Sequence, residues 1–521
     1  MVKPLNFVLR LSASVVCAML LGSCQQNSHA LQPPSAAAVR APQQNVKTVV
    51  VIDAENRSFD NLFGKFPGAN GLRTVMDAEG KPTRAYIPQK NCDGVTVIPT
   101  LVHRFLENQM QIHDGKNDGF AAWSNAGGFT MTNFDYSNSA MFKLAREFVL
   151  ANNFFQGAFG GSFHNHQNLI CACAPEYPNA ATAVAKPSIA QVQTNDSGKF
   201  LPALVVAART GPSALDGLPV FANSGNVTPA NYFGDRKFYA INTMLPPYQP
   251  SGNVPAISGN ALYADPDKST ILPAQTIGDL LNNKQVPWKW YSGSWTAAAR
   301  DGALNDSARR VIYKTGKNGV SSGSDVDFET HHQPFNYYAA FDPTVHAANR
   351  AAHLTKHDAL VNDITAGTLP SVVFYKPEGL YNQHEGNTDV DNGNARIANL
   401  AWKLRASSQW KNMVVVVTYD EFGGSWDHVA PPKGDLLGPG TRIPAIIISP
   451  FANAGTVDHT QYDTGSVMRL ITRVFDLGML CGLAKRDLAL MQAGGKPMGD
   501  QTNALHFWWS TRLWAPVEMR A

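Results

Sequence analysis

Short runs of apolar, mostly β-branched residues recur along the chain and predict buried strands. They occupy residues 47–53 (KTVVVID), 288–292 (WKWYS), 371–376 (SVVFYK), 413–419 (MVVVVTY) and 445–449 (AIIIS). Continuous hydrophobicity of this kind is typical of strands that are covered on both faces. Helical patterns lie between the runs, at residues 139–150, 276–283, 395–407 and 465–477. The alternation predicts an α/β fold, a three-layer sandwich with a largely parallel central sheet.

The first residues predict export. Lys3 and Arg10 flank a short positive region, residues 11–23 carry no charge, and Leu-Gly-Ser-Cys ends at Cys24. The uncharged run is shorter than the ~20 residues of a membrane-spanning helix, so we expect a signal peptide over residues 1–23. The Leu-Gly-Ser-Cys order resembles a bacterial lipobox, which implies that Cys24 is lipidated and anchors the protein on the periplasmic side of a membrane or at the cell surface. Ordinary signal cleavage near Ala30 is the alternative.

The rest of the chain is expected to hold a tether and one domain. Residues 24–46 are polar and rich in Pro and Ala, which predicts a flexible tether. Residues 47–521 then form a single domain. Around residues 201–273 the composition changes to Pro, Gly, Asn and Ser with weak periodicity. We interpret this stretch as a long loop-rich insertion, a lid or a substrate-binding flap.

Charge and cysteine content narrow the class of protein. Lys and Arg number 43 against 40 Asp and Glu, so no basic field follows a nucleic-acid backbone and we expect no nucleic-acid partner. After Cys17 leaves with the signal and Cys24 is lipidated, the remaining even number of cysteines favours disulfides in an oxidising compartment. These are Cys92, Cys171, Cys173 and Cys481. Cys171 and Cys173 stand too close in sequence to bond each other comfortably, so we expect each to pair with one of the other two. A C-x-C zinc pair is the alternative.

Oxygen-bearing side chains follow two of the predicted strands. Glu55 and Asn56 come shortly after the strand at 47–53, and Asp420 and Glu421 come directly after the strand at 413–419. Ligands of open α/β sheets bind at the carboxyl ends of the strands. An all-oxygen set suits a divalent cation such as Ca²⁺, Mg²⁺ or Mn²⁺, and without one the carboxylates would repel each other. Taken singly, either pair could instead be a helix cap or a surface turn.

A Gly-Gly-Ser sequence and several histidines supply the other candidates. Gly160 and Gly161 precede Ser162 at a plausible helix start, where a tight turn would present the hydroxyl as a metal-assisted nucleophile. A simple helix-capping turn is the alternative. Histidines near a metal site can grip phosphate oxygens and protonate a leaving alcohol, although each of them could equally be structural. The candidate histidines are His103, His331, His332 and His384.

Four blocks of the sequence resemble, in order, those of the bacterial phosphoesterase family, which joins acid phosphatase A-type enzymes to the non-specific phospholipases C. The blocks are ENRSFD (55–60) with Phe63-Gly64, FF (154–155) with GGS (160–162), TIGDLL (276–281) with WKWY (288–291), and YDEFGG (419–424) with DHVAPP (427–432). The resemblance spans roughly residues 47–473. It implies an alkaline-phosphatase-like core and hydrolysis of phosphomonoesters or phosphodiesters through a covalent phosphoserine.

The resemblance also implies roles for individual residues. Ser162 resembles the nucleophile. The set that resembles the ligands of one divalent metal ion, with Ca²⁺ favoured by the oxygen donors, is Glu55, Asn56, Ser162, Asp420 and Glu421. His103, His331 and His332 resemble residues that contact the phosphoryl group, and His384 resembles the histidine near the nucleophile. Asp427 and His428 are assigned only supporting positions around the ligands.

Between the two branches of the family, the sequence favours a broad-specificity acid phosphatase that acts on small phosphorylated substrates. Phospholipases C of the family usually carry a twin-arginine signal and added C-terminal β-domains, whereas Arg10 is single and only a short segment follows the last matching block. The His331-His332 pair also resembles the acid phosphatase branch. The alternatives are a phospholipase C acting on lipid head groups and a surface binding protein without turnover. The only membrane contact expected is the lipid anchor.

Overall fold

The computed structural model describes residues 42–72, 101–174, 275–302 and 328–507, apart from short gaps, together with a few isolated residues between 193 and 239. The predicted signal peptide, Cys24, Cys92 and nearly all of the 201–273 insertion lie outside the described residues. The predicted tether, residues 24–46, extends too far toward the C-terminus. Val46 is buried in the core and donates its backbone N–H to Pro42 O. Among the described residues, no helix combines the length and apolar character needed to cross a membrane.

An eight-stranded sheet forms the centre of the described domain, in the order β11-β2-β10-β9-β1-β8-β6-β7. The strands are β1 (Thr48–Ala54), β2 (Val149–Ala151), β6 (Trp288–Ser292), β7 (Leu354–Lys356), β8 (Val372–Lys376), β9 (Met413–Tyr419), β10 (Ala445–Ile448) and β11 (Thr456–Asp458). Two small two-stranded sheets pair β3 (Phe154–Phe155) with β12 (Tyr462–Asp463) in parallel and β4 (Gln193–Thr194) with β5 (Phe200–Leu201) in antiparallel fashion. All five predicted strands are present.

The sheet is largely parallel, as predicted, with one exception that the sequence pattern did not indicate. β10 runs antiparallel to both of its neighbours, β9 and β2. The predicted helix over 139–150 is too long, because helix α4 ends at Glu147 and the next residues form strand β2 against β10. Val149 and Leu150 are apolar and fully buried in the sheet, so their contribution to the helical pattern was accidental.

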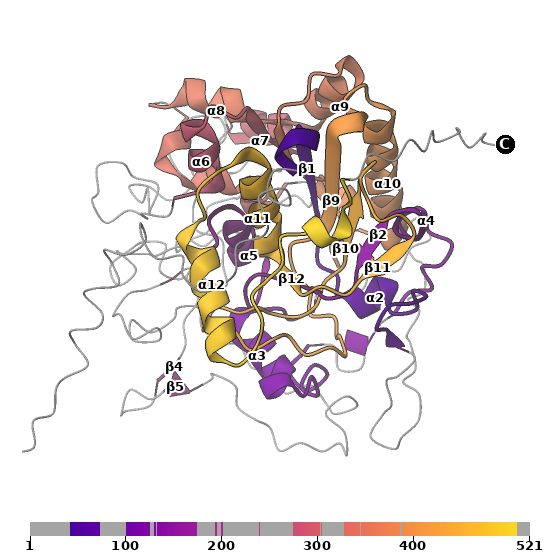
Figure 1. The fold of residues 1–521 in the computed structure, drawn as a ribbon. Coiled ribbons are helices and arrows are strands. Elements are labelled where there is room, and N and C mark those ends of the chain that lie inside the picture. Colours follow the sequence, from indigo (N-terminus) through magenta and orange to yellow (C-terminus); the bar gives the residue numbers. More distant parts are fainter. Residues whose placement is uncertain are drawn as a thin grey trace, which may run out of the picture. The chain divides into compact units, whose positions relative to one another are not determined.

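Helices cover both faces of the sheet. Figure 1 shows α4, α9 and α10 on one side of β1 and β9, and α5, α6 and α11 on the other, which gives the three layers expected from the sequence. The helices are α2 (Phe59–Phe63), α3 (Phe105–Ile112), α4 (Ala140–Glu147), α5 (Ser162–Cys171), α6 (Ile277–Asn283), α7 (Trp295–Gly302), α8 (Ala347–His353), α9 (His357–Ala366), α10 (Val390–Ala406), α11 (Thr464–Phe475) and α12 (Cys481–Gln492). Several short 3₁₀ turns connect them, among them η7 (Thr330–His332).

Side-chain caps set the starts of the predicted helices. Thr276 and Asp279 form a reciprocal capping box at α6, and Asp463 forms one with Ser466 at α11. Helix α10 begins earlier than predicted because Asp389 accepts a hydrogen bond from the backbone of Asn392 and caps it there.

The expectation about the cysteines was wrong, because Cys171 and Cys173 are bonded to each other. Helix α5 ends at Cys171, and Ala172 adopts a left-handed conformation with φ 51°. This turn brings the two Cα atoms to 5.2 Å, a separation that a disulfide can span. Neither cysteine therefore pairs with Cys92 or Cys481.

Candidate functional site

The carboxyl ends of β1 and β9 place the two predicted pairs of oxygen ligands side by side. Ala54 and Tyr419 are partners in the parallel register, and the pairing continues beyond the strands as Asp420 N donates to Ala54 O at 3.0 Å. Asn56, held at φ 49°, donates its backbone N–H to Asp420 Oδ1 at 3.3 Å. All four side chains are buried. The prediction that Glu55, Asn56, Asp420 and Glu421 meet at this edge of the sheet is confirmed.

Ser162 joins this group from helix α5. Its Oγ donates to Glu421 Oε1 at 3.2 Å and to Asn56 Oδ1 at 3.5 Å. The residue is the first of the helix, as predicted, and follows a turn that only glycine accommodates. Gly160 has φ 87°, and a Cβ on it would lie 2.4 Å from the backbone nitrogen of Phe105. The turn thus fixes Ser162 against the carboxylates.

The carboxylates have opposite tendencies to ionise. Burial raises the pKa of both Asp420 and Glu421, and the neighbouring carboxylates raise it further. Burial also opposes the charge on Glu55, but Lys376 and His332 outweigh it and hold the pKa of Glu55 below its ordinary value. Asp420 Oδ2 is buried without a hydrogen-bond partner. Crowded, buried hard oxygens with an unpaired carboxylate atom fit a divalent cation.

The four predicted histidines surround these carboxylates. His332 Nε2 lies 2.7 Å from Glu55 Oε1, and His384 Nε2 lies 3.8 Å from Glu55 Oε2 on the same side chain. His103 Nε2 lies 3.4 Å from Glu421 Oε1. His331 packs its ring edge-on against that of His332, and its imidazole shares one potential cation site with His332 and Glu55. The structure therefore brings every predicted site residue together.

Two of these histidines present the same ring nitrogen to the site. The Nδ1 of His103 lies 2.6 Å from Leu101 O, and the Nδ1 of His384 bonds to Glu385 O. Because a carbonyl only accepts, each Nδ1 carries the proton, and each neutral ring turns the Nε2 lone pair toward the site. Burial, followed by the nearby charge of His384, lowers the pKa of His103 to about 4. Burial also lowers the pKa of His384. Both rings can therefore accept a proton and release it readily.

Three further residues belong to the site and were not assigned from the sequence. Lys376, the last residue of β8, places its Nζ 2.9 Å from Glu55 Oε1 and 3.5 Å from Asp53 Oδ2. His166 lies one helical turn after Ser162, with its Nε2 3.4 Å from Asp53 Oδ2 and its Nδ1 3.6 Å from Asp420 Oδ2. A charged residue at the end of an apolar strand was the available signal for Lys376 and Asp53.

An ion pair supports the loop that carries His384. Arg57 donates to Gln383 O through Nε at 3.0 Å and Nη2 at 2.7 Å, and its Nη1 lies 3.0 Å from Glu385 Oε1. Ser425 Oγ donates to the same Glu385 oxygen at 2.7 Å. Burial raises the pKa of Glu385 to about 7, although Arg57 and Ser425 both act to lower it. This buried network ties the loop after β1 to the loop after β8.

Asp427 and His428 lie in a second cluster, and their supporting role around the ligands stays a prediction. His428 Nδ1 lies 2.6 Å from Asp60 Oδ2. The guanidinium of Arg442 lies 3.0 Å from Asp60 Oδ1 and 2.9 Å from Asp427 Oδ1. The arginine already balances these two carboxylates, so the cluster ties the start of α2 to the loop after β9.

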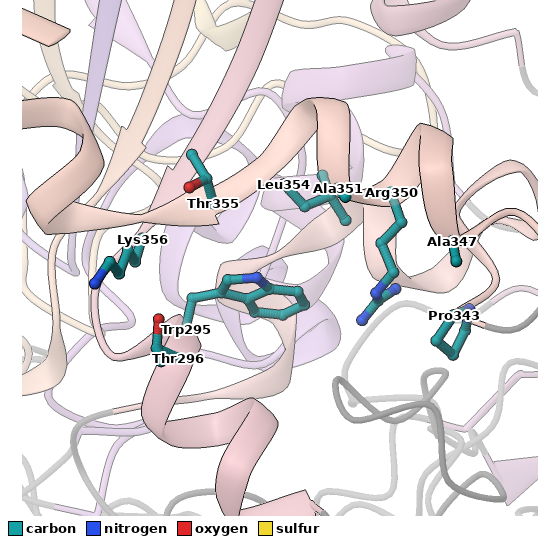
Figure 2. Close-up of a pocket in the computed structure, with 9 residues that line it drawn as sticks. All are labelled: Trp295, Thr296, Pro343, Ala347, Arg350, Ala351, Leu354, Thr355 and Lys356. Atoms are coloured by element: carbon teal, nitrogen blue, oxygen red, sulfur yellow. The ribbon is translucent and has the colours of Figure 1, made fainter.

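A separate cavity of about 410 Å³ opens beside helices α7 and α8 (Figure 2). Trp295 lies at its centre, and the guanidinium of Arg350 lies 5.0 Å from the ring centroid while donating to Phe341 O at 2.7 Å. Leu354 and Lys356 also line it. None of the residues brought together around Ser162 lines this cavity, so it is not part of the candidate site.

Comparisons with known proteins place this geometry in a family context. Non-specific phospholipase C6 of Arabidopsis thaliana is 30% identical over 145 residues, which cover 22% of this chain and 28% of the relative. Phospholipase C A of Mycobacterium tuberculosis is 26% identical over 192 residues, which cover 32% of this chain and 35% of the relative. The matched part of this chain therefore spans only about a third of the length of each relative.

Structural similarity is weaker than sequence similarity. A Vibrio parahaemolyticus protein of the alkaline phosphatase superfamily aligns with 92% of this chain and 79% of its own, at 11% identity and a TM-score of 0.32. The profile of the Phosphoesterase family, in contrast, matches residues 46–478, which include the whole candidate site. The chain therefore belongs to the Phosphoesterase family.

Proposed function

We propose that the protein hydrolyses phosphoesters with Ser162 as the nucleophile. The observation that carries the proposal is the position of Ser162 Oγ, 3.2 Å from Glu421 Oε1 and 3.5 Å from Asn56 Oδ1 at the start of helix α5. The hydroxyl thus stands among buried carboxylates, and backbone N–H groups at a helix start favour a phosphoryl group there. Membership of the Phosphoesterase family supports the same chemistry.

In the proposed reaction, Ser162 Oγ attacks phosphorus as the bond from phosphorus to the leaving oxygen breaks. A neutral histidine, His103 or His384, takes the hydroxyl proton at Nε2 and passes it to the leaving oxygen, which departs as the alcohol. Water then attacks the phosphoserine and gives one proton, through the same histidine, to Oγ as the Oγ–P bond breaks. This restores the serine and releases phosphate, or a phosphomonoester from a diester substrate. We assign to His331 and His332, both close to Glu55, contacts with the phosphoryl oxygens.

The residues that would hold a divalent cation are Glu55, Asn56, Ser162, Asp420 and Glu421. A single such ion, with Ca²⁺ favoured by the oxygen donors, would polarise the serine oxygen and offset charge on the phosphoryl group. The protein supplies the geometry around it. Glu55 is fixed by Lys376 and His332, and Asp420 is fixed through the backbone N–H groups of Asn56 and Glu421.

For the substrate, we propose phosphomonoesters, as in a broad-specificity acid phosphatase. The adjacent His331 and His332, both at the site, support this choice through their resemblance to that branch. Phospholipid phosphodiesters are the second candidate. The observation in their favour is that several relatives carry the name phospholipase C.

One assay separates these readings. Wild type and Ser162→Ala are compared on p-nitrophenyl phosphate and on phosphatidylcholine, each with and without a chelator of divalent cations. We expect wild type to turn over the monoester faster, the chelator to suppress turnover, and the variant to be inactive with an unchanged far-UV CD spectrum. Near-normal turnover by the variant would remove Ser162 as nucleophile. Faster hydrolysis of the lipid would move the enzyme to the phospholipase branch.

A further inference from the structure

Lys376 is a buried cation in direct contact with the carboxylates of the site. It is fully buried at the end of β8. Its Nζ lies 2.9 Å from Glu55 Oε1, 3.5 Å from Asp53 Oδ2 and 4.0 Å from Asp420 Oδ2, and it donates to Ala54 O at 3.3 Å. The ammonium therefore sits among three carboxylates from two adjacent strand ends. Such a position resembles that of a bound ion more than that of an ordinary lysine, which seldom is fully buried.

The carboxylates divide into two groups around this ammonium. Asp53 faces Lys376 and His166. Glu421 faces Ser162 and His103 instead. Glu55 and Asp420 lie between, each within ion-pair distance of Lys376. Asp53, Glu55 and Asp420 thus have the ammonium of Lys376 as a cationic partner, whereas no lysine or arginine of the described residues pairs with Glu421 beside Ser162.

We propose that Lys376 is a positioning residue that takes the place of a second metal ion, so that the site binds one divalent cation, on the side of Ser162. The inference rests on the proposed function, because it assigns the remaining ligands to that cation. Lys376 touches neither Ser162 nor the place proposed for substrate. Its ammonium offsets the charge of Asp53 and part of the charge of Glu55 and Asp420, while the five residues named above as ligands, Glu55 among them, hold the ion.

The proposal predicts that two substitutions change the affinity for a cation in opposite directions. Lys376→Met removes a positive charge at nearly constant length, and Asp53→Asn removes a negative charge at constant shape. Both groups act on the cation through space, so their loss should have opposite effects. We expect Lys376→Met to bind Ca²⁺ at least about tenfold more tightly, or to bind a second ion, and Asp53→Asn to bind it several-fold more weakly. The double variant should return to within about threefold of wild type.

Calcium binding is measured by titration calorimetry on the purified, chelator-treated protein, with Ca²⁺ alone as the probe. We expect one ion per wild-type chain. If Lys376→Met does not fold, the double variant is compared with Asp53→Asn, and it should bind Ca²⁺ more tightly because the two differ only in the lysine charge. A purely structural lysine would lower stability without giving affinity changes of opposite sign.

Several results would overturn the inference. Equal affinity and stoichiometry with and without Lys376, shifts of the same sign in the two single variants, or two ions in wild type would each do so, and each would leave Ser162 in place as the proposed nucleophile. No cation binding by wild type would overturn both this inference and the metal-assisted function. Turnover by Ser162→Ala would contradict the proposed function, while the calcium titrations would still decide the role of Lys376.

Discussion

Glu385 should make the stability of this protein fall as the pH rises through neutrality. Its carboxyl is buried beside Arg57 and Ser425, and burial raises its pKa from 4.5 to about 7. Below pH 4.5 both the folded and the unfolded chain hold the proton. Between the two values the unfolded chain releases it while the folded chain retains it, so the contribution of this group to stability is lost as the pH rises.

The size of the effect follows from the two pKa values. Each pKa unit corresponds to about 1.4 kcal/mol, so the rise from 4.5 to about 7 amounts to about 3 kcal/mol lost between pH 4 and pH 8. Glutamine at this position cannot ionise and keeps the shape of the protonated acid. The free energy of unfolding of wild type minus that of Glu385→Gln should therefore decrease by about 3 kcal/mol over this range.

Urea unfolding, followed by tryptophan fluorescence at intervals between pH 4 and pH 8, measures this difference, and taking it at each pH cancels the contributions of other titrating groups. Ser425→Ala is the matched control. It removes a hydrogen bond that lowers the pKa of Glu385 but leaves the carboxyl, so the loss of stability should begin at the same pH and extend to a higher pH than in wild type. A wild-type minus Glu385→Gln difference that stays flat, or that rises with pH, would refute the reasoning.

Two further substitutions test the supports of the site. Gly160→Ala should lose at least ~1 kcal/mol of stability and most turnover, because its φ is 87° and the new Cβ would meet Phe105 N at 2.4 Å; an unchanged melting temperature would contradict this. Arg442→Met should lose about 3–5 kcal/mol in urea unfolding, because it removes the guanidinium that pairs with the buried Asp60 and Asp427. Partial recovery with Asp427→Asn added would support the charge explanation, and no recovery would count against it.

The parts of the fold that the sequence predicted are those governed by local pattern. The strand at Met413–Tyr419 was located to the residue, because seven buried residues in succession leave no other arrangement than a central strand. The direction of β10 could not be predicted in the same way. A strand that is covered on both faces has the same continuous apolar sequence whether its neighbours run parallel or antiparallel. β2 was missed because its three residues are too few to show a period and continue the apolar face of α4.

Within the site, residues that follow strands were predicted and residues that pair across the sheet were not. Glu55 and Asp420 were found because the carboxyl ends of strands are where ligands bind. Lys376 and Asp53 were missed because each lies in the last two residues of an apolar strand, and only the register of β8 beside β1 brings their side chains together. His166 was missed because its neighbours Asp53 and Asp420 come from two separate strand ends. Such juxtapositions follow from long-range pairing, which one sequence alone does not specify.

The distribution of buried charge bears on the cation that we propose beside Ser162. Only 16% of the residues are charged, yet three buried cations stand at this edge of the sheet, each against carboxylates: Arg57, Lys376 and Arg442. In the described part of the chain, no lysine or arginine lies within ion-pair distance of Glu421, and His103 Nε2 lies 3.4 Å from its Oε1. Burial of a carboxylate without a cationic partner costs several kcal/mol, and Glu421 is such a carboxylate beside Ser162, the proposed nucleophile. A divalent ion there would offset that cost and serve the reaction at the same place.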